Sequence, residues 1–365
     1  MTLSGAAPRI YALTEGARVF RNGDEIRFRK GVWSYTEATI RLTGQEEPVK
    51  QFFETIYTRF LQYQEVDVDE IGREIGANAT ELALYCEVLD DLKRQKYLVN
   101  PQEHDPTRIL SALLGDNLSG FERYAGTPRS VLFFTDNDYA RNAAKTLAKE
   151  IGLPLDVLDD ETMEELAAAD LTSRTDAVRY TETITRFAKV FHPYMCVIGC
   201  MAAPNLSLLR NLNRILINAE KPLILGMIDG PFMSVLSTLA TQTGCFECYE
   251  HRLLARLQDT LVYHRFVAST TQTRTIDGSR FAPMLHILTS AVVSEGYVYS
   301  TLGMMRLAGR ILNIYMPLLE IQVEDLLRVP YCPACGSISR AEMSDMYTST
   351  KRLVTEMLSK IELED

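Results

Sequence analysis

The chain has 365 residues, of which 46% are hydrophobic, and its formal net charge is −10. This length allows two domains with sizeable cores, and the acidic balance argues against a general binder of nucleic acids or anionic membrane surfaces. No uninterrupted apolar run approaches the roughly 20 residues that cross a bilayer, and no secretory signal is recognisable at the start. Seven cysteines, four of them in metal-type spacing, suit a reducing compartment, so we expect a cytoplasmic protein.

Residues 9–42 predict three short strands. The segments 18–21 and 25–29 flank Asn22-Gly23, a dipeptide suited to a tight hairpin turn. After Gly31, residues 33–42 are rich in aromatic and β-branched side chains and predict the third strand.

Helical patterns follow this strand region. The first begins near Glu46, the second covers residues 68–75 and stops at Gly76, and the third begins at a cap-like Asn78. The third carries Leu82, Tyr85, Val88, Leu89 and Leu92 on one face. Three strands and three helices within residues 1–100 predict a small winged helix-turn-helix domain.

A winged-helix domain can bind duplex DNA or capture a peptide. Duplex DNA binding needs a positive stripe, but acidic residues outnumber basic ones in residues 1–100. Peptide capture by strand addition needs only an exposed sheet edge beside an apolar groove. We therefore expect the third strand and third helix to form the walls of a peptide site, with these candidate residues: Trp33, Ser34, Tyr35, Thr36, Glu37, Ala38, Thr39, Ile40, Arg41, Leu82, Tyr85, Leu89 and Leu92. A cationic patch would favour an acidic peptide, although such charges are more often plain solvated faces: Arg18, Arg21, Arg27, Arg29 and Lys30.

Residues 101–129 are polar and punctuated by proline, and they predict a connector with one short helix at 107–114. From residue 130 the pattern changes to apolar strands that alternate with helices, which predicts an α/β domain with a parallel doubly wound sheet over residues 130–365. The expected strands are 130–134, 155–158, 194–199, 222–226 and 232–236. The long apolar region 279–319 predicts core helices.

Two cysteine pairs lie far apart in this domain. Each pair has two residues between its thiols, and a glycine stands beside each pair. Four thiolates are the ligand set of a closed structural zinc site, which leaves no position for water or substrate. A redox dithiol is the alternative, but such a motif occurs once and opens a helix, whereas here the motif is doubled. The expected zinc ligands are Cys245, Cys248, Cys332 and Cys335.

The order of strands, helices and cysteine pairs resembles the ubiquitin-activating-enzyme (E1/ThiF-like) superfamily, in which two such pairs bind a structural zinc. The N-terminal domain, with its segment 28–33, is similar to the RiPP recognition element (RRE, PqqD-like) that binds leader peptides of ribosomally made natural products. Together they resemble the cyclodehydratase partner protein (C protein) of thiazole/oxazole-modified peptide and bacteriocin clusters, close to the streptolysin-associated type. The resemblance covers nearly the whole chain.

The chain departs from active members of this superfamily where they bind nucleotide. A glycine-rich turn should follow the first strand, so that backbone amides can approach phosphates. Residues 135–140 contain no glycine and two carboxylates, Asp136 and Asp138, which we expect to cap the following helix. The strand at 194–199 continues into Cys200 and Met201, where the resemblance implies a magnesium-binding aspartate. We therefore expect a degenerate E1-like domain that binds no ATP and has no catalytic residue.

The resemblance implies a non-catalytic adaptor that presents a precursor leader peptide to a YcaO-family cyclodehydratase, the ATP-dependent partner that forms azolines. A flavin dehydrogenase and a homodimer remain open, and no nucleic acid or membrane partner is expected. Two alternatives stay open as well: an E1-like enzyme that adenylates a peptide, and a zinc-stabilised winged-helix transcription regulator.

Overall fold

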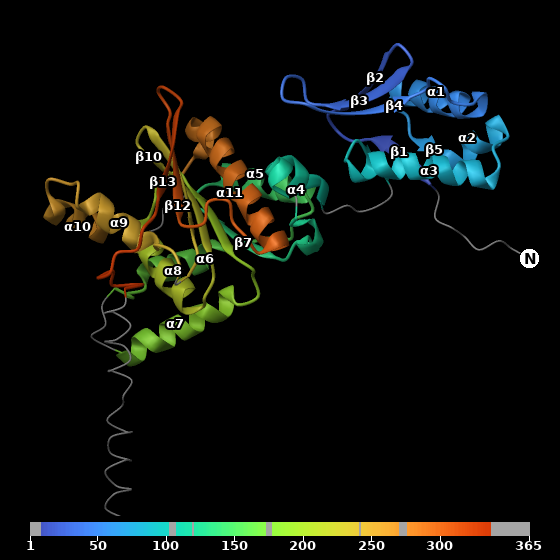
Figure 1. The fold of residues 1–365 in the computed structure, drawn as a ribbon. Helices are drawn as coiled ribbons and strands as arrows, with labels where there is room; N and C mark the ends of the chain where they lie inside the picture. Colours follow the sequence, from blue (N-terminus) through green and yellow to red (C-terminus); the bar gives the residue numbers. More distant parts are fainter. Residues whose placement is uncertain are drawn as a thin grey trace, which may run out of the picture. The chain divides into compact units, whose positions relative to one another are not determined.

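The computed structural model describes residues 9–101, 107–118, 120–172, 177–240, 242–269 and 276–336. The chain divides into two compact units, an N-terminal unit up to Asp105 and a second unit from Pro106 onward (Figure 1). Parts of the predicted domains, residues 1–8 and 337–365 among them, lie outside the described residues.

The N-terminal unit contains two small sheets rather than one. In the first, β2 (Ala17–Asn22), β3 (Glu25–Lys30) and β4 (Thr36–Arg41) form an antiparallel meander, and β4 is an edge strand. In the second, β1 (Ile10–Leu13) lies between β5 (Val66–Asp67) and β6 (Leu98–Val99). The three predicted strands are therefore present as β2, β3 and β4, and the prediction missed β1, which pairs with two-residue strands that have no pattern of their own.

Both turns of the meander differ from the prediction. Asn22 pairs with Glu25, so the hairpin turn consists of Gly23 and Asp24, and Gly23 takes the positive φ of 60°. Residues 31–35 form a loop, so the third strand begins at Thr36 and not at Trp33. Gly31 is required in this loop, because its φ is +90° and a Cβ there would lie 2.2 Å from the Ser34 carbonyl oxygen.

The three predicted helices of the N-terminal unit are present as α1 (Glu47–Leu61), α2 (Val68–Ile75) and α3 (Ala79–Arg94). Asn78 and Glu81 form a complete capping box at the start of α3, and α2 ends at Gly76 with a left-handed φ of 71°. The helices pack on the meander around a core of aromatic residues, in which Phe52 stacks on Tyr85 with 4.1 Å between ring centroids. The winged-helix assignment of this unit stays a prediction.

The second unit is built on a seven-stranded sheet with the order β13-β12-β11-β10-β9-β7-β8. Pairings among β8, β7, β9 and β10 are parallel, whereas β11, β12 and β13 extend the sheet with antiparallel pairings. The expected parallel sheet thus makes up half of the pairings, and the mixed α/β class is confirmed. The strands are β7 (Val131–Thr135), β8 (Leu155–Val157), β9 (Val197–Met201), β10 (Leu223–Asp229), β11 (Phe232–Thr238), β12 (Arg310–Tyr315) and β13 (Glu320–Asp325).

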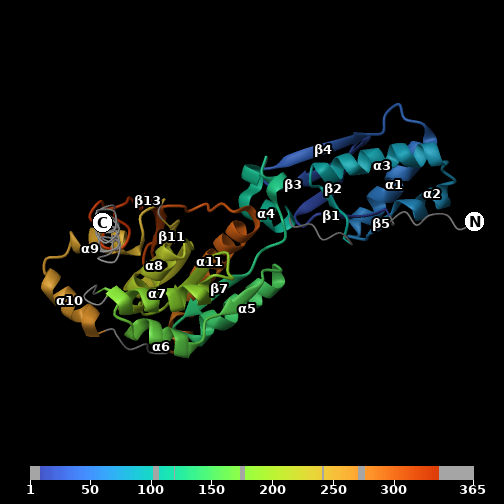
Figure 2. The ribbon, with the colours of Figure 1, turned by 90° about the horizontal axis from the view of Figure 1, so that it is seen from below.

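Helices cover both faces of this sheet (Figures 1 and 2). One face packs on α4 (Thr107–Leu114), α5 (Asp138–Glu150) and α11 (Ala282–Leu302). The other packs on α6 (Asp160–Ala168), α7 (Ala177–Phe191) and α8 (Leu206–Asn218). In both views α9 (Phe246–Leu254) and α10 (Thr260–Ser269) lie on the side of the unit away from α5. Short 3-10 turns occupy Gly115–Leu118, Glu122–Tyr124 and Gly278–Phe281.

Two regions of this unit differ from expectation. Leu110, Leu114 and Leu118 are buried in the core beneath the sheet, so this part of the predicted connector belongs to the second unit. Region 279–319 contains one long helix, α11, and then β12, so the prediction of helices alone was wrong. Leu302 is the last residue of α11, because Gly303 takes a left-handed φ of 71°. Within the described residues, no helix is both long and apolar enough to span a bilayer.

Candidate metal centre

The two cysteine pairs meet although residues 249–331 separate them in the sequence. Cys245 is the N-cap of α9 and Cys248 lies in its first turn, whereas Cys332 and Cys335 lie in the loop after β13. All four side chains are buried, and their sulfur atoms lie within 4.8 Å of one another. The structure therefore brings together all four predicted ligands.

The spacing of the sulfur atoms fits a tetrahedral ion. Zinc–sulfur bonds of about 2.3 Å place tetrahedral sulfurs about 3.8 Å apart. The observed separations are 3.8 Å for Cys245–Cys248, 3.6 Å for Cys245–Cys332 and 3.3 Å for Cys248–Cys335. The four thiols could hold a metal ion with only small adjustments.

Hydrogen bonds divide the four thiols into two kinds. The backbone N–H of Val329 donates to Cys248 Sγ at 3.3 Å, and the N-terminus of α9 lies at the first pair. Hydrogen bonds from Cys245 lower the pKa of Cys248 and that of Cys335, the latter to about 7, whereas the hydrogen bond with Cys248 raises the pKa of Cys245, and the pKa of Cys332 is raised as well. By contrast, burial raises the pKa of Cys196, which lies outside the cluster, to about 12.

The first pair does open a helix, so helix position does not separate it from a redox dithiol, and the convergence of two pairs makes the distinction. The glycine beside each pair allows close packing. A Cβ on Gly244 would lie 2.6 Å from the Leu326 carbonyl oxygen, and one on Gly336 would lie 2.5 Å from that of Cys332.

The sequence analysis missed two residues on α8 that contact the first pair, Asn213 and Arg214. Asn213 hydrogen-bonds to Cys245, Phe246 and Glu247, and Arg214 forms a bidentate ion pair with Glu247. The available signal was a group of four polar residues within 210–214, interrupted by Leu212, inside an otherwise mostly apolar helix. Helical periodicity alone could not reveal its partners.

The predicted peptide-binding residues lie in three different environments. Trp33, Ser34 and Tyr35 form part of the exposed loop before β4, and Trp33 is 93% exposed. Within the edge strand β4, Ala38 and Ile40 pack partly against the core of the unit, whereas Thr36, Thr39 and Arg41 are exposed and Glu37 is half-buried. Of the helix positions, Leu82 is half-buried, but Tyr85, Leu89 and Leu92 lie in the core, so their side chains are not on the surface.

The predicted cationic patch is largely neutralised within the sheet. Arg27 forms ion pairs with Glu25 and Glu37 at 2.6 and 2.7 Å. Arg29 also pairs with Glu37, and its guanidinium lies 3.8 Å from the centre of the Tyr35 ring. The expected preference for an acidic peptide therefore loses most of its support.

The carboxyl ends of β7 and β9 meet at the place where open α/β sheets bind ligands. Here the Asp136 carboxylate is buried and accepts three hydrogen bonds: from the Ala202 N–H at 2.9 Å, the Ala203 N–H at 2.7 Å and Asn137 Nδ2 at 2.9 Å. The Asp136 carbonyl oxygen accepts a fourth, from the Ile276 N–H at 3.0 Å.

The neighbouring residues complete this closed turn. Asn137, and neither of the two expected aspartates, caps α5 by accepting from the Ala140 N–H at 2.8 Å. Gly278 packs against it, since a Cβ there would lie 2.8 Å from Asn137 Oδ1. The amides that a phosphate could use are therefore already bonded to a side chain of this protein.

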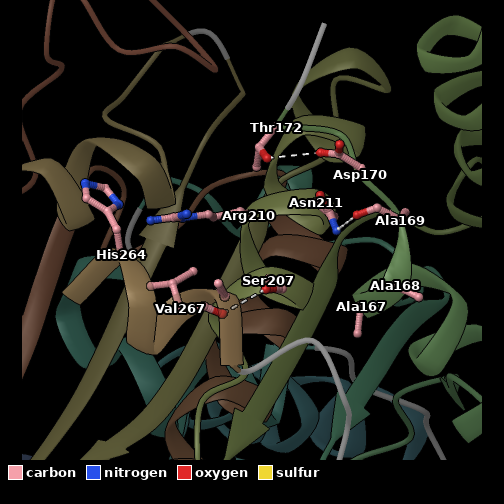
Figure 3. Close-up of a pocket in the computed structure, with 11 residues that line it drawn as sticks. Ala167, Ala168, Ala169, Asp170, Thr172, Ser207, Arg210, Asn211, His264 and Val267 are labelled. Atoms are coloured by element: carbon pink, nitrogen blue, oxygen red, sulfur yellow. Dashed lines mark hydrogen bonds between the residues drawn. The ribbon is translucent and has the colours of Figure 1, made fainter. Parts of the chain in front are cut away.

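A hollow of about 270 Å³ lies between α6, α8 and α10 (Figure 3). Most of its polar side chains are already engaged: Ser207 donates to the Val267 carbonyl oxygen, Thr172 to Asp170, and Asn211 to the Ala169 carbonyl oxygen. Arg210, which also lines the hollow, is paired with Glu250 at 2.8 Å. We therefore assign no ligand to this hollow.

The fold of this chain is similar to the folds of two solved heterocyclase structures. The chain is similar to a heterocyclase in complex with substrate and cofactor, with a TM-score of 0.55 and 14% identity over 89% of this chain and 39% of that chain. It is also similar to the heterocyclase TruD, with a TM-score of 0.53 and 16% identity over 89% of this chain and 42% of that chain. E. coli MccB with ATP gives a TM-score of 0.45 at 12% identity over 90% of this chain and 100% of that chain.

The chain thus spans about two fifths of the heterocyclase chains whose fold it shares. No family description matches the sequence, and no curated protein matches it. At these identities the likeness shows the fold.

Proposed function

We propose that this chain is the leader-peptide-binding adaptor of a YcaO-dependent cyclodehydratase that forms azolines in a precursor peptide. The N-terminal unit binds the leader, and the second unit, held together by a structural zinc at the four cysteines, docks the catalytic partner. The adaptor raises the local concentration of the core peptide at the partner and contributes no catalytic group.

The fold and its coverage support the assignment to this pathway. The similarity runs over 89% of this chain but reaches only 39% and 42% of the two heterocyclase chains. The remainder of those chains corresponds to polypeptide that a separate partner subunit would supply. The catalytic partner is the natural candidate for that remainder.

The observation that most supports a non-catalytic role is the bonding of Asp136. Its carboxylate lies at the carboxyl ends of β7 and β9, where open α/β sheets bind ligands, and it already accepts the N–H groups of Ala202 and Ala203. A triphosphate brought there would meet this carboxylate and lose the amides, and the two negative charges would repel each other. We infer that the second unit does not bind ATP.

The open edge of β4 supports leader capture by strand addition. Within the described residues β4 pairs with β3 alone, so one row of its backbone N–H and C=O groups faces outward. The half-buried Leu82, Ala38 and Ile40 supply apolar surface close to the core. The exposed loop of Trp33 and Tyr35 precedes this edge and is a further contact for the peptide.

A leader titration tests the first half of the proposal. Trp33 is the single tryptophan and is 93% exposed, so its fluorescence should shift to shorter wavelength when the cognate leader covers it. Leader peptides N-methylated at successive positions should bind with a period of two, because only alternate N–H groups of an added strand face β4. Equal affinity at every N-methylated position would exclude strand addition.

Reconstitution tests the second half. The chain together with the YcaO partner, ATP and the precursor should produce rings with loss of one water each, whereas the chain alone should neither form rings nor exchange pyrophosphate into ATP. Pyrophosphate exchange by the purified chain would establish the adenylating enzyme instead.

A further inference from the structure

Helix α8 carries buried polar side chains that reach two different parts of the second unit. Asn211 and Asn213 are both 2% exposed, and Arg214 is 6% exposed. Asn211 bonds to the backbone of Leu166 and Leu171 near the end of α6, away from the cysteines. Asn213 and Arg214 bond to the beginning of α9, and Arg214 also donates to the Leu171 carbonyl oxygen.

The start of α9 needs an outside acceptor. Ordinarily the N-cap side chain accepts a hydrogen bond from the first turn, but the N-cap of α9 is Cys245, which makes no such bond. Asn213 supplies the missing acceptor from α8, because its Oδ1 accepts the Phe246 N–H at 3.1 Å. A side chain of a neighbouring helix thus caps α9 and leaves the Cys245 sulfur available as a ligand.

This bond also fixes the other end of the amide. Since Oδ1 faces a backbone donor, Nδ2 must point the opposite way, toward Cys245 Sγ at 3.6 Å and Glu247 Oε1 at 3.3 Å. An N–H donor beside a thiolate stabilises its negative charge and orients its lone pairs.

Arg214 holds the same turn from the next position of α8. Its Nε and one terminal nitrogen donate to the two Glu247 oxygens, each at 2.8 Å, and both side chains are buried. Glu247 stands between Cys245 and Cys248, so this ion pair fixes the segment that carries both thiols.

We propose that Asn213 is a positioning residue of the metal centre. It holds Cys245 in its ligating orientation and donates to its thiolate, and Arg214 supports it by fixing Glu247. Zinc affinity therefore depends on a side chain of α8 that is not itself a ligand. This inference rests on the zinc centre of the proposed function.

Asn213→Ala and Asn213→Asp separate orientation from charge. The alanine variant removes both the cap and the donor, and we expect it to weaken zinc binding about 10- to 100-fold. The aspartate variant keeps volume and the acceptor for Phe246 but places a carboxylate next to the thiolates. We expect its zinc affinity to fall further than that of the alanine variant, even where the cap is retained.

Asn211→Ala is the matched control, since Asn211 lies on the same helix with the same burial and bonds away from the cysteines. The full chain is titrated with Zn²⁺ against a chromophoric chelator, and the unfolding of each metal-free variant is recorded alongside. Cobalt in place of zinc adds a spectroscopic readout of tetrahedral thiolate ligation. We expect Asn211→Ala to reduce stability but to leave zinc affinity within about twofold of the original chain.

The outcomes distinguish the inference from its premise. If the original chain binds no zinc or cobalt, the metal centre of the proposed function is wrong, and the inference is wrong with it. If the original chain binds zinc and both Asn213 variants match Asn211→Ala in affinity, the centre stands and the role of Asn213 is refuted. If Asn213→Ala does not fold, the affinity of Asn213→Asp decides on the same criterion.

Discussion

The second unit buries two groups of acidic side chains, the Asp136 carboxylate and the four cysteine thiols, and they differ in how a negative charge on them would be compensated. The Asp136 carboxylate is buried but has three N–H donors supplied by the protein itself. The four cysteine thiols are buried together and accept hydrogen bonds from the Val329 N–H and the Asn213 amide, which lie outside the cluster. A buried anion needs compensating charge or hydrogen bonds. The carboxylate therefore needs no ligand, whereas four thiolates require a cation.

Both sites join segments that are far apart in the sequence. At the carboxyl ends of β7 and β9, the Asp136 side chain joins the two loops that follow these strands. At the cysteines, the ion would join α9 to the loop after β13. Both are cross-links, but only the second depends on something supplied from outside.

The largest effect is expected from breaking the cysteine centre. Cys332→Ser should lose bound zinc and lower the free energy of unfolding by about 4 kcal/mol or more, since structural zinc in small zinc-finger peptides contributes about 10–16 kcal/mol of apparent binding energy. Metal analysis and urea unfolding measure the two quantities. Cys196→Ala is the control, because Cys196 is buried in the same unit but outside the cluster. A Cys332→Ser protein with unchanged zinc content and midpoint would disprove the cross-link.

A smaller but substantial effect is expected at the closed site. Asp136→Ala leaves the N–H groups of the buried Ala202 and the exposed Ala203 without their acceptor and should cost about 3 kcal/mol of unfolding free energy. Inorganic phosphate should restore part of this stability, because it can occupy the vacated amides, and it should have little effect on the original chain.

Asp138→Ala serves as the control for that experiment. The Asp138 side chain is 69% exposed and pairs with Arg141, so its removal should change stability by less than about 0.5 kcal/mol. Equal stability of Asp136→Ala and the original chain would remove the main argument for a closed nucleotide site.

A substitution in the N-terminal unit provides a reference for the two losses of unfolding free energy described above. Asn78→Ala removes the capping box of α3 and should cost about 1 kcal/mol. Zinc content should not change, because the metal centre belongs to the other unit. Loss of zinc in this variant would mean that the two units fold as one.

The smallest effect concerns a carboxylate that has donors but is exposed. The Asp159 carboxylate accepts hydrogen bonds from the Thr162 N–H at 2.7 Å and from the Thr162 hydroxyl at 2.8 Å. Both bonds lower the pKa of Asp159, and the bond from the backbone N–H has the larger effect. A lowered folded-state pKa contributes stability above the unfolded value of about 3.9, and this contribution disappears as the pH falls below it.

Asp159→Asn should therefore lower stability slightly at pH 7 and not at about pH 2. Unfolding midpoints of both proteins across this range provide the measurement. A difference that grows toward low pH would contradict the sign.

Local patterns were sufficient for several features of the chain. Residues 68–75 show a helical pattern that is followed by a glycine, and the structure has α2 and its end at Gly76 at the predicted positions. The strand at β10 and the cap at Asn78 were also predicted, because each depends on neighbouring residues. The four clustered cysteines were predicted because a spacing of two residues between thiols is typical of metal ligands.

Other features depend on partners far away in the sequence. The two-residue strands β5 and β6 are too short to carry a periodic signal, and they form because β1 lies between them. The strand β13 alternates polar and apolar residues over 320–324, but it was not among the expected strands. Tyr85, Leu89 and Leu92 are buried in the core together with residues of α1 and the meander. These three residues were expected to line the peptide site.

Residue identity and short-range spacing were enough to predict the candidate metal ligands, most helices, the α/β class and the lack of a glycine-rich turn after the first strand. The bonding of Asp136 to the end of β9, the capping of α9 by Asn213 and the pairing of Arg27 and Arg29 with Glu37 depend on how the chain folds. Hydrogen bonds and ion pairs form between atoms within about 3 Å, and only the folded chain brings residues as distant as 136 and 202 to that separation.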